Sequence, residues 1–169
     1  MTGMTIRFED VGTIAQTCLC ANIQRAARAI GRRFDDAFRP LDLTNWQFTL
    51  MVALYRSQPP TITLVANDLA TDRTTITANL KPLERRGLVR VSPDKDDRRA
   101  RRVALTASGL ALLQQAYAVW IRAQDAIVAD LALEDMDGVL ASLRAIAAVK
   151  PEGGAPGDGP DTDLMAQSR

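Results

Sequence analysis

The chain of 169 residues contains no histidine, only two cysteines and few aromatic residues. Without histidine it cannot build imidazole metal sites, catalytic triads with a histidine base or imidazole pH switches. Because aromatic residues make up 5% of the chain, its core should consist mostly of Leu, Ile, Val and Ala. No nucleophile–base pair or metal cluster stands out either. We therefore expect neither an enzyme nor a bound cofactor or metal ion.

The sequence also lacks a membrane span and a signal peptide. The longest uncharged run, residues 103–121, contains polar side chains such as Thr106 and Gln114, which indicate a buried helix. At the N-terminus, Arg7 is followed by acidic residues, and no apolar stretch precedes a cleavage site. The expected location is therefore cytoplasmic, with no membrane partner.

The composition that remains, 47% apolar residues and a net charge of +1, is typical of a single globular domain. We expect residues 1–10 to be a flexible leader and residues 11–149 to form that domain. Residues 150–169 should be a disordered tail, because they include three prolines and four glycines. Inside the domain, a central lobe of about residues 44–106 is expected between helices at about residues 11–39 and 107–149.

The flanking helices have more apolar residues than the core of one small domain needs. From about Val11 to Phe38, apolar residues repeat at intervals of three and four, which predicts one long helix. A second long helix is expected from Thr106 to about Leu131, and a final one over residues 136–147. These surplus apolar faces suggest pairing with a second copy of the chain.

The central lobe contains the pattern of a helix-turn-helix. In its second helix, Asp72 is placed to cap the start and Gly87 to end the helix in a left-handed turn. Ile76, Leu80 and Leu83 share one apolar face at helical spacing. A short helix that precedes this one would support it from behind.

The opposite face of the second helix presents short hydroxyls first and cations later. It carries Thr74, Ala78, Lys81 and Arg85, with Thr75 and Thr77 on its flanks. Small polar side chains let a backbone approach base edges, and long cations reach phosphates at the groove wall. This gradient suits a helix that enters a DNA major groove N-terminus first. For a helix standing alone, a solvated polar surface would be the alternative.

A basic β-hairpin follows the helix. Residues 88–92 and 101–106 have the alternation of strands, and residues 93–100 form a charged tip. Between Arg73 and Arg102 there are ten Lys or Arg against four Asp or Glu, a local net charge of +6 in a chain whose total is +1. The positive charge is concentrated where helix and hairpin would meet a polyanion.

These residues resemble the MarR family of winged-helix transcriptional regulators. The resemblance depends on the order and spacing of three motifs, Asp72-Arg73-Thr74-Thr75-Ile76-Thr77, Leu83-Glu84-Arg85-Arg86-Gly87-Leu88-Val89, and Asp94-Lys95-Asp96-Asp97-Arg98-Arg99 before Val103-Ala104-Leu105-Thr106. It covers about residues 12–149. It implies a mainly α-helical fold with a small β-hairpin wing and a homodimer held by the flanking helices. Two positions depart from the family pattern: Ala78 is often arginine in relatives, and Pro82 should bend the helix.

The resemblance further implies a sequence-specific regulator, by family habit a repressor, that binds double-stranded DNA at a palindromic operator. The expected DNA contacts are outward residues of the helix and wing: Arg73, Thr74, Thr75, Thr77, Lys81, Arg85, Arg98, Arg99 and Arg101. Arg98 and Arg99 are expected to reach a narrow minor groove, where the potential is most negative. Asp96 and Asp97 are expected to hold these guanidiniums in place.

Relatives often bind a small effector, frequently aromatic or anionic, between the dimer helices and the DNA-binding lobe, and its binding would release the repressor. The residues placed to line such a cleft are Arg25, Arg28, Trp46, Met51, Tyr117 and Trp120. Core packing explains the aromatic residues equally well.

Cys18 and Cys20 would project about 200° apart from a continuous helix, so a disulfide between them would require that helix to unwind. Two small buried hydrophobic residues are one interpretation, and a thiol sensor is the other. The alternatives to an effector-released repressor are therefore a redox-sensing regulator that uses these thiols, or a helical effector-binding or interaction dimer that no longer reads DNA.

Overall fold

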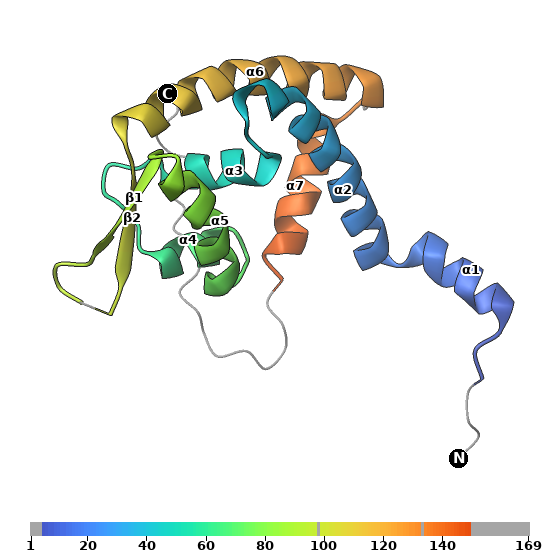
Figure 1. Ribbon diagram of the computed structural model, residues 1–169. Helices are drawn as coiled ribbons and strands as arrows, with labels where there is room; N and C mark the ends of the chain where they lie inside the picture. The colour runs from blue at the N-terminus through green and yellow to red at the C-terminus, as the bar shows by residue number, and fades with distance from the viewer. Residues whose placement is uncertain (1–4, 98, 133, 150–169) are drawn as a thin grey trace.

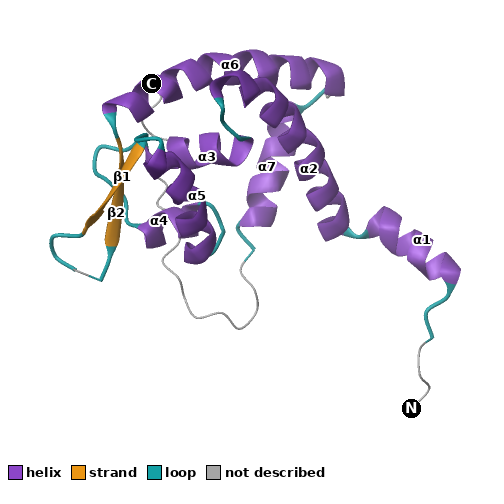
Figure 2. Cartoon of the chain, in the orientation of Figure 1, coloured by secondary structure: helices purple, strands orange, loops and turns teal. Residues whose placement is uncertain are grey.

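The structure, a computed structural model, describes residues 5–97, 99–132 and 134–149. Within these residues the chain is mainly helical and carries one antiparallel two-stranded hairpin (Figures 1 and 2). This architecture confirms the expected fold class. Arg98 and the expected tail, residues 150–169, lie outside the described residues.

The elements, in chain order, are α1 (Phe8–Thr17), α2 (Leu19–Phe38), the 3-10 helix η1 (Arg39–Leu41), α3 (Asn45–Leu54), α4 (Ile62–Asp68), α5 (Arg73–Arg85), β1 (Val89–Pro93), β2 (Arg101–Leu105), α6 (Ala107–Leu131) and α7 (Met136–Ala147). In Figure 1, α6 runs across the top of the molecule, and the hairpin lies at one side beside α4 and α5. At the other side, α1 projects away from the remaining helices.

The single long helix expected over residues 11–38 is wrong, because the structure contains two helices that meet at Cys18. That residue has extended backbone angles, φ −66° and ψ 109°. The side-chain amide of Asn22 donates to the carbonyl oxygens of Gln16 (3.2 Å) and Cys18 (2.9 Å). A side chain that binds carbonyl groups next to the break competes with the regular helical pattern. The helix also begins earlier than expected, at Phe8.

Polar side chains cap the first turns of three further helices. Thr44 and Gln47 form a reciprocal capping box at the start of α3, in which each side chain accepts the other residue's backbone N–H. Thr61 caps α4 and Thr106 caps α6 in the same position. Such side chains satisfy backbone N–H groups that have no partner inside the helix.

The hydrophobic core lies where α2, α3, α4, α5 and α6 meet the hairpin. Its fully buried side chains include Phe38, Leu50, Ile76, Leu83 and Val103. Aliphatic residues dominate it, as the composition predicts, although Phe34 and Phe38 of α2 stack on each other and Phe48 of α3 packs in a tilted orientation against Phe38. This core supports the inward face of α5 and leaves the outward face free.

The start of α6 is fixed directly to the turn that ends α5. The backbone N–H of Thr106 donates to the carbonyl oxygen of Leu88 (3.0 Å), and its hydroxyl donates to that of Gly87 (2.6 Å). Gly109 lies so close that a Cβ atom there would collide with the Leu88 carbonyl. The position of α5 is therefore tied to that of the long helix α6.

The surplus apolar faces remain exposed in the single chain. Neither α1 nor α7 contains a buried residue. On α7, the side chains of Val139, Leu140, Leu143 and Ile146 are 38–44% exposed. No helix among the described residues is long and apolar enough to cross a membrane.

Candidate nucleic-acid interface

The first turn of α5 is built on Asp72. One carboxylate oxygen accepts the backbone N–H of Thr75 (2.8 Å), and the other accepts the hydroxyl of Thr75 (2.7 Å). The hydroxyl first, and then the backbone N–H, stabilise the charged carboxylate and hold the pKa of Asp72 below its ordinary value. At the other end, Gly87 has φ 68°, the left-handed conformation that glycine adopts without strain. Both predicted boundaries of the helix are confirmed.

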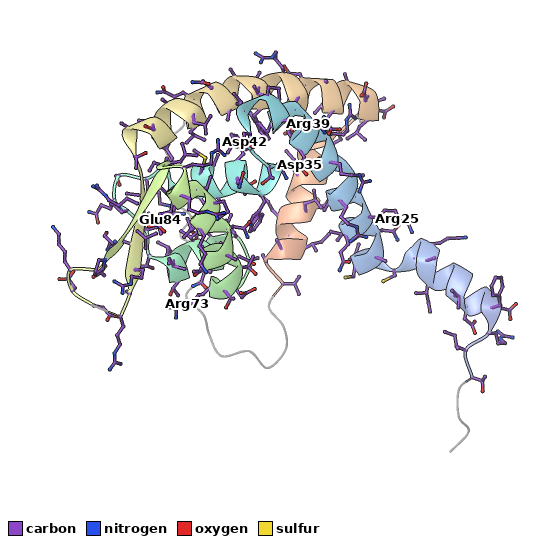
Figure 3. All side chains as sticks on the ribbon, viewed as in Figure 1. Arg25, Asp35, Arg39, Asp42, Arg73 and Glu84 are labelled. Atoms are coloured by element: carbon purple, nitrogen blue, oxygen red, sulfur yellow. The ribbon has the colours of Figure 1, made fainter. Side chains whose placement is uncertain are left out.

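The two faces of α5 are those expected from the sequence. Ile76, Leu80 and Leu83 are buried, whereas the opposite face consists of exposed residues, namely Arg73, Thr74, Thr77, Ala78, Lys81 and Arg85. Figure 3 labels Arg73 and Glu84, which lie toward the two ends of this helix. Pro82 lies inside α5, and the helix continues past it to Arg85. The exposed face thus presents threonines early and cations at both ends.

The three threonines of this face differ in their contacts. Thr75 is half-buried, and its hydroxyl proton is directed to Asp72. Thr77 is exposed but donates to the carbonyl oxygen of Arg73 (2.8 Å). Thr74 is exposed, and its side chain makes no hydrogen bond with the described residues. All three retain hydroxyl oxygen atoms that can accept a hydrogen bond from a base edge.

The wing is a regular hairpin with one face on the core. Val91 pairs with Val103 and Pro93 with Arg101, so Val89, Val91 and Val103 point inward together. The last pair and the tip beyond it carry exposed cations. Lys95, Arg99 and Arg101 are exposed, whereas Arg98 lies outside the described residues.

The conformation of the tip depends on Asp94, whose role no local sequence pattern indicates. Its side chain is buried; one oxygen accepts the backbone N–H groups of Asp96 (2.7 Å) and Asp97 (3.0 Å), and the other pairs with the guanidinium of Arg102. The two backbone donors contribute most to holding the pKa of Asp94 below its ordinary value, and Arg102 contributes further. Arg102 also donates to the carbonyl oxygen of Pro59 (2.7 Å). Asp94 therefore links the wing, through Arg102, to the loop before α4.

The expected role of Asp96 and Asp97 needs a correction for Arg99, whereas for Arg98, outside the described residues, it stays a prediction. Among the described residues, Arg99 forms no salt bridge with either carboxylate. Asp97 instead accepts the backbone N–H of Arg99 (2.9 Å), and both acidic residues contribute N–H groups to Asp94. The only arginine of the hairpin that the described residues pair with a carboxylate is Arg102. No local sequence pattern indicates the Asp94–Arg102 pair, because Asp94 follows the end of β1 and Arg102 lies on β2, on the other side of the hairpin tip.

The arginines and lysines of this region divide into two groups. Within the described residues no salt bridge involves Arg73, Lys81, Arg85, Arg90, Lys95, Arg99 or Arg101. Arg102 and Arg86, in contrast, lie near carboxylates of the same chain, Arg102 near that of Asp94 and Arg86 near that of Asp42. The first group, which includes every described cation selected from the sequence as well as Arg90 and Lys95, keeps its charge available to an external polyanion.

The predicted effector residues occupy several environments. Arg25 and Arg28 are exposed on α2, and Figure 3 labels Arg25 on the side away from the hairpin. Tyr117 and Trp120 stack on α6 with ring centroids 5.9 Å apart. Met51 is completely buried in the core. Trp46 is half-buried, and its indole N–H is enclosed without a hydrogen-bond partner among the described residues.

Both cysteines are free and lie at the junction of α1 and α2. Cys18 is half-buried and Cys20 is exposed. The interpretation as two buried hydrophobic residues is therefore wrong for the single chain. The expected angle between their side chains no longer applies, because it assumed a continuous helix and the chain is extended at Cys18.

The chain is similar to known transcriptional regulators. The model of the MarR family matches residues 43–100, from the start of α3 through the wing tip. The HTH-type transcriptional regulator TtmR of Methylorubrum extorquens strain PA1 is 31% identical over 94 residues, which are 56% of this chain and 48% of TtmR. The match thus spans about half the length of that curated relative.

Solved structures agree over more of the chain. The transcriptional regulator MosR of M. tuberculosis, in complex with DNA, is 36% identical, with a TM-score of 0.68 over 77% of this chain and 93% of MosR. The transcriptional repressor CouR, bound to a 23-mer DNA duplex, is 26% identical, with a TM-score of 0.70 over 85% of this chain and 99% of CouR. This chain combines a capped helix α5 with a basic wing, matches the MarR family model, and is 36% identical to MosR over 93% of the length of MosR. It therefore belongs to the MarR family of winged-helix transcriptional regulators.

Proposed function

We propose that this protein is a sequence-specific regulator that binds double-stranded DNA through α5 and the wing. The observation that carries the proposal is the division of the basic residues. Arg73, Lys81 and Arg85 on α5, and Arg99 and Arg101 on the hairpin, are exposed and free of salt bridges among the described residues. Threonines lie between the cations of α5 at positions where short side chains can approach base edges. MosR and CouR, the two relatives described above, were solved with DNA.

The proposed roles follow from side-chain length and position. Thr74, Thr75 and Thr77 would address base edges in the major groove, and the cations of α5 would contact phosphates. Arg98 and Arg99 would reach the minor groove or the adjacent backbone from the wing tip, with Arg101 close to the strand end. The rival class, an effector-binding dimer that no longer reads DNA, does not require this set of unpaired cations.

We propose that the regulator acts as a homodimer. The exposed apolar residues of α1 and α7 support this, because a monomer would leave both faces in water. A two-fold dimer places its recognition helices about one turn of DNA apart, roughly 10 base pairs, so the expected operator is palindromic. The proposed mode of action is repression, and the similarity to CouR, which is named a transcriptional repressor, supports it. The proposed location is the cytoplasm.

The deciding experiment is a binding assay with the DNA upstream of the protein's own gene. Full-length protein would be titrated onto a labelled duplex of that region and onto a shuffled duplex of equal length and composition. We expect tighter binding to the upstream DNA, with protection of two half-sites in a footprint. Equal affinity for both duplexes would contradict sequence-specific regulation, and absence of binding to either would favour the effector-binding dimer.

Release by a small effector is the second part of the proposal. Arg25 and Arg28 offer exposed positive charge, and Trp46 offers an enclosed indole N–H without a partner among the described residues. An aromatic anion fits these two features, because its carboxylate would pair with a guanidinium and its ring would pack on the indole of Trp46. A panel of aromatic acids should include compounds that dissociate the operator complex, and Arg28→Ala should reduce their effect without changing DNA affinity.

A thiol-based release is the other candidate, and the break between α1 and α2 favours it. The objection to a Cys18–Cys20 disulfide was a continuous helix, whereas Cys18 lies in an extended conformation. A hydroperoxide would oxidise the two thiols to one disulfide and leave as the alcohol and water, taking up two electrons and two protons. Peroxide should then release DNA from the wild type but not from Cys18→Ser. Retained binding in the oxidised wild type would exclude this route.

A further inference from the structure

Arg86 follows directly after α5, but its side chain does not join the cations available to DNA. Its guanidinium donates to two backbone carbonyl oxygens, those of Leu41 (3.3 Å) and Asp42, at the end of η1. The Asp42 carboxylate lies 3.6 Å away, but it is 92% exposed. Because solvent screens so exposed a charge, the two carbonyl oxygens are the principal partners of Arg86.

These carbonyl groups belong to the end of a helix. α2 continues into η1 at Arg39, and the chain then turns at Asp42 with φ 51°. The last carbonyl groups of a helix lack N–H partners within it, and they carry the negative end of the helix dipole. A cation that donates to them satisfies both requirements. Arg86 therefore caps the α2–η1 segment from the end of the recognition helix. Figure 3 labels Asp42 at this junction, beside α3.

The same end of α5 has a second attachment. The Thr106 hydroxyl donates to the Gly87 carbonyl oxygen (2.6 Å), one residue after Arg86. The end of the recognition helix is thus joined to α2–η1 through Arg86 and to α6 through Thr106. Because α2 and α6 are the two longest helices of the chain, these bonds set the direction of α5 relative to the framework of the subunit.

We propose that Arg86 is a positioning residue for DNA recognition. It holds the end of α5 against α2–η1 and so sets the angle at which α5 approaches base edges, without contacting DNA itself. This inference rests on the proposed function. It separates two neighbouring arginines that look equivalent in the sequence: Arg85 faces outward with no salt bridge among the described residues, whereas Arg86 serves the fold of the lobe.

The test compares Arg86→Ala with Arg85→Ala, its matched control. Affinity for the operator and for a random duplex would be measured over a range of salt. Arg86→Ala should weaken operator binding about tenfold, because it removes two charge-assisted hydrogen bonds to α2–η1, and leave random-duplex affinity and its salt slope unchanged. Arg85→Ala should weaken both duplexes alike and flatten the slope by about one for each phosphate contact that is lost. If Arg86→Ala behaves like Arg85→Ala, Arg86 contacts phosphate and the proposal is overturned.

Two further variants keep the test decisive if Arg86→Ala does not fold. Arg86→Lys retains a donor for one carbonyl oxygen, so its ratio of operator affinity to random-duplex affinity should lie between those of the wild type and Arg86→Ala. If Arg86 only stabilised the fold, its replacement would lower the thermal midpoint and leave that ratio unchanged. Asp42→Asn keeps both carbonyl groups, and asparagine tolerates positive φ, so it should resemble the wild type. A loss in Asp42→Asn equal to that in Arg86→Lys would mean that the carboxylate is the anchor, which would overturn the helix-capping argument.

A measurement without DNA separates this inference from the proposed function. Backbone amides at the end of α5 should exchange faster in Arg86→Lys than in Arg85→Ala, because only the former weakens the attachment to α2–η1. Equal exchange in the two variants would refute the attachment. A wild type that binds no operator would instead refute the proposed function, whatever the exchange result.

Discussion

Asp72 holds Thr75 with both of its carboxylate oxygens, one on the backbone N–H at 2.8 Å and one on the hydroxyl at 2.7 Å. The residue that begins the recognition helix therefore also orients a side chain expected to read DNA. A change at Asp72 should affect both the stability of α5 and the geometry of its first turn.

The first prediction concerns this cap. Asp72→Ala removes the acceptor for the Thr75 N–H and should lower the thermal midpoint by roughly 2–4 °C. Asp72→Asn keeps an acceptor oxygen and should lower it less. Circular dichroism melts of the three proteins would measure the difference. Equal midpoints in wild type and Asp72→Ala would show that the first turn does not depend on the cap.

The second prediction is a loss of stability in acid. Folding lowers the pKa values of Asp72 and Asp94 below the ordinary 3.8. Protons therefore bind more weakly to the native state, so this stabilisation is present above the ordinary pKa and is lost as the pH falls through the lowered values. Between pH 5 and pH 3 the thermal midpoint should fall less steeply with pH for Asp94→Asn than for the wild type, because the asparagine side chain has no carboxylate to protonate. An unchanged slope in that variant would contradict the assignment.

The third prediction concerns base reading by the threonines. Thr77→Ala should relax discrimination at particular base pairs, by about 1 kcal/mol or more if the hydroxyl binds a base edge. Thr75→Ala should do the same and also disturb the first turn, whereas Thr75→Ser keeps the hydroxyl and should retain both properties. Affinities for single-base variants of the operator would test this. Unchanged base preferences in both alanine variants would remove the threonines from the site.

The fourth prediction concerns the wing and the electrostatic part of binding. If about four phosphates per subunit are neutralised, log K should fall with log salt at a slope on the order of −7 for the dimer. Arg98→Ala or Arg99→Ala should weaken binding to operator and random duplex alike and flatten this slope by about one for each phosphate that the variant no longer neutralises. A wild-type slope near zero would mean that the basic hairpin does not lie on the DNA backbone.

The fifth prediction concerns assembly. Light scattering at micromolar concentration should show a dimer, because association would cover the exposed apolar face of α7. Leu143→Glu places a charge on that face and should weaken the dimer. Ala141→Glu places the same charge on the opposite side of the exposed helix and serves as the matched control. A monomeric wild type, or equal weakening in both variants, would contradict a dimer held by α7.

The parts of the site that the sequence alone determined are those with local causes. The Asp72 cap, the left-handed Gly87 and the buried face of Ile76, Leu80 and Leu83 each depend on backbone geometry within a few residues. The hairpin likewise follows from alternation and a polar tip. These features were predicted correctly because capping, helical periodicity and strand alternation act over one or two turns of chain. The DNA contacts assigned to this face stay predictions.

Only the tertiary structure decided how the arginines divide. Arg86 finds its acceptors 44 and 45 residues away in sequence, and Arg102 contacts Pro59 across 43. No local pattern separates these residues from Arg85 or Arg101, because the sequence shows an arginine at each position and not whether its guanidinium faces solvent or the end of a distant helix. The break at Cys18 also escaped a prediction based on apolar periodicity, which continues across it while the Asn22 side chain binds the carbonyl groups beside it. Which cations remain available for DNA was therefore settled by packing, since the folded chain alone brings distant carbonyl groups and carboxylates within hydrogen-bond distance of particular guanidiniums.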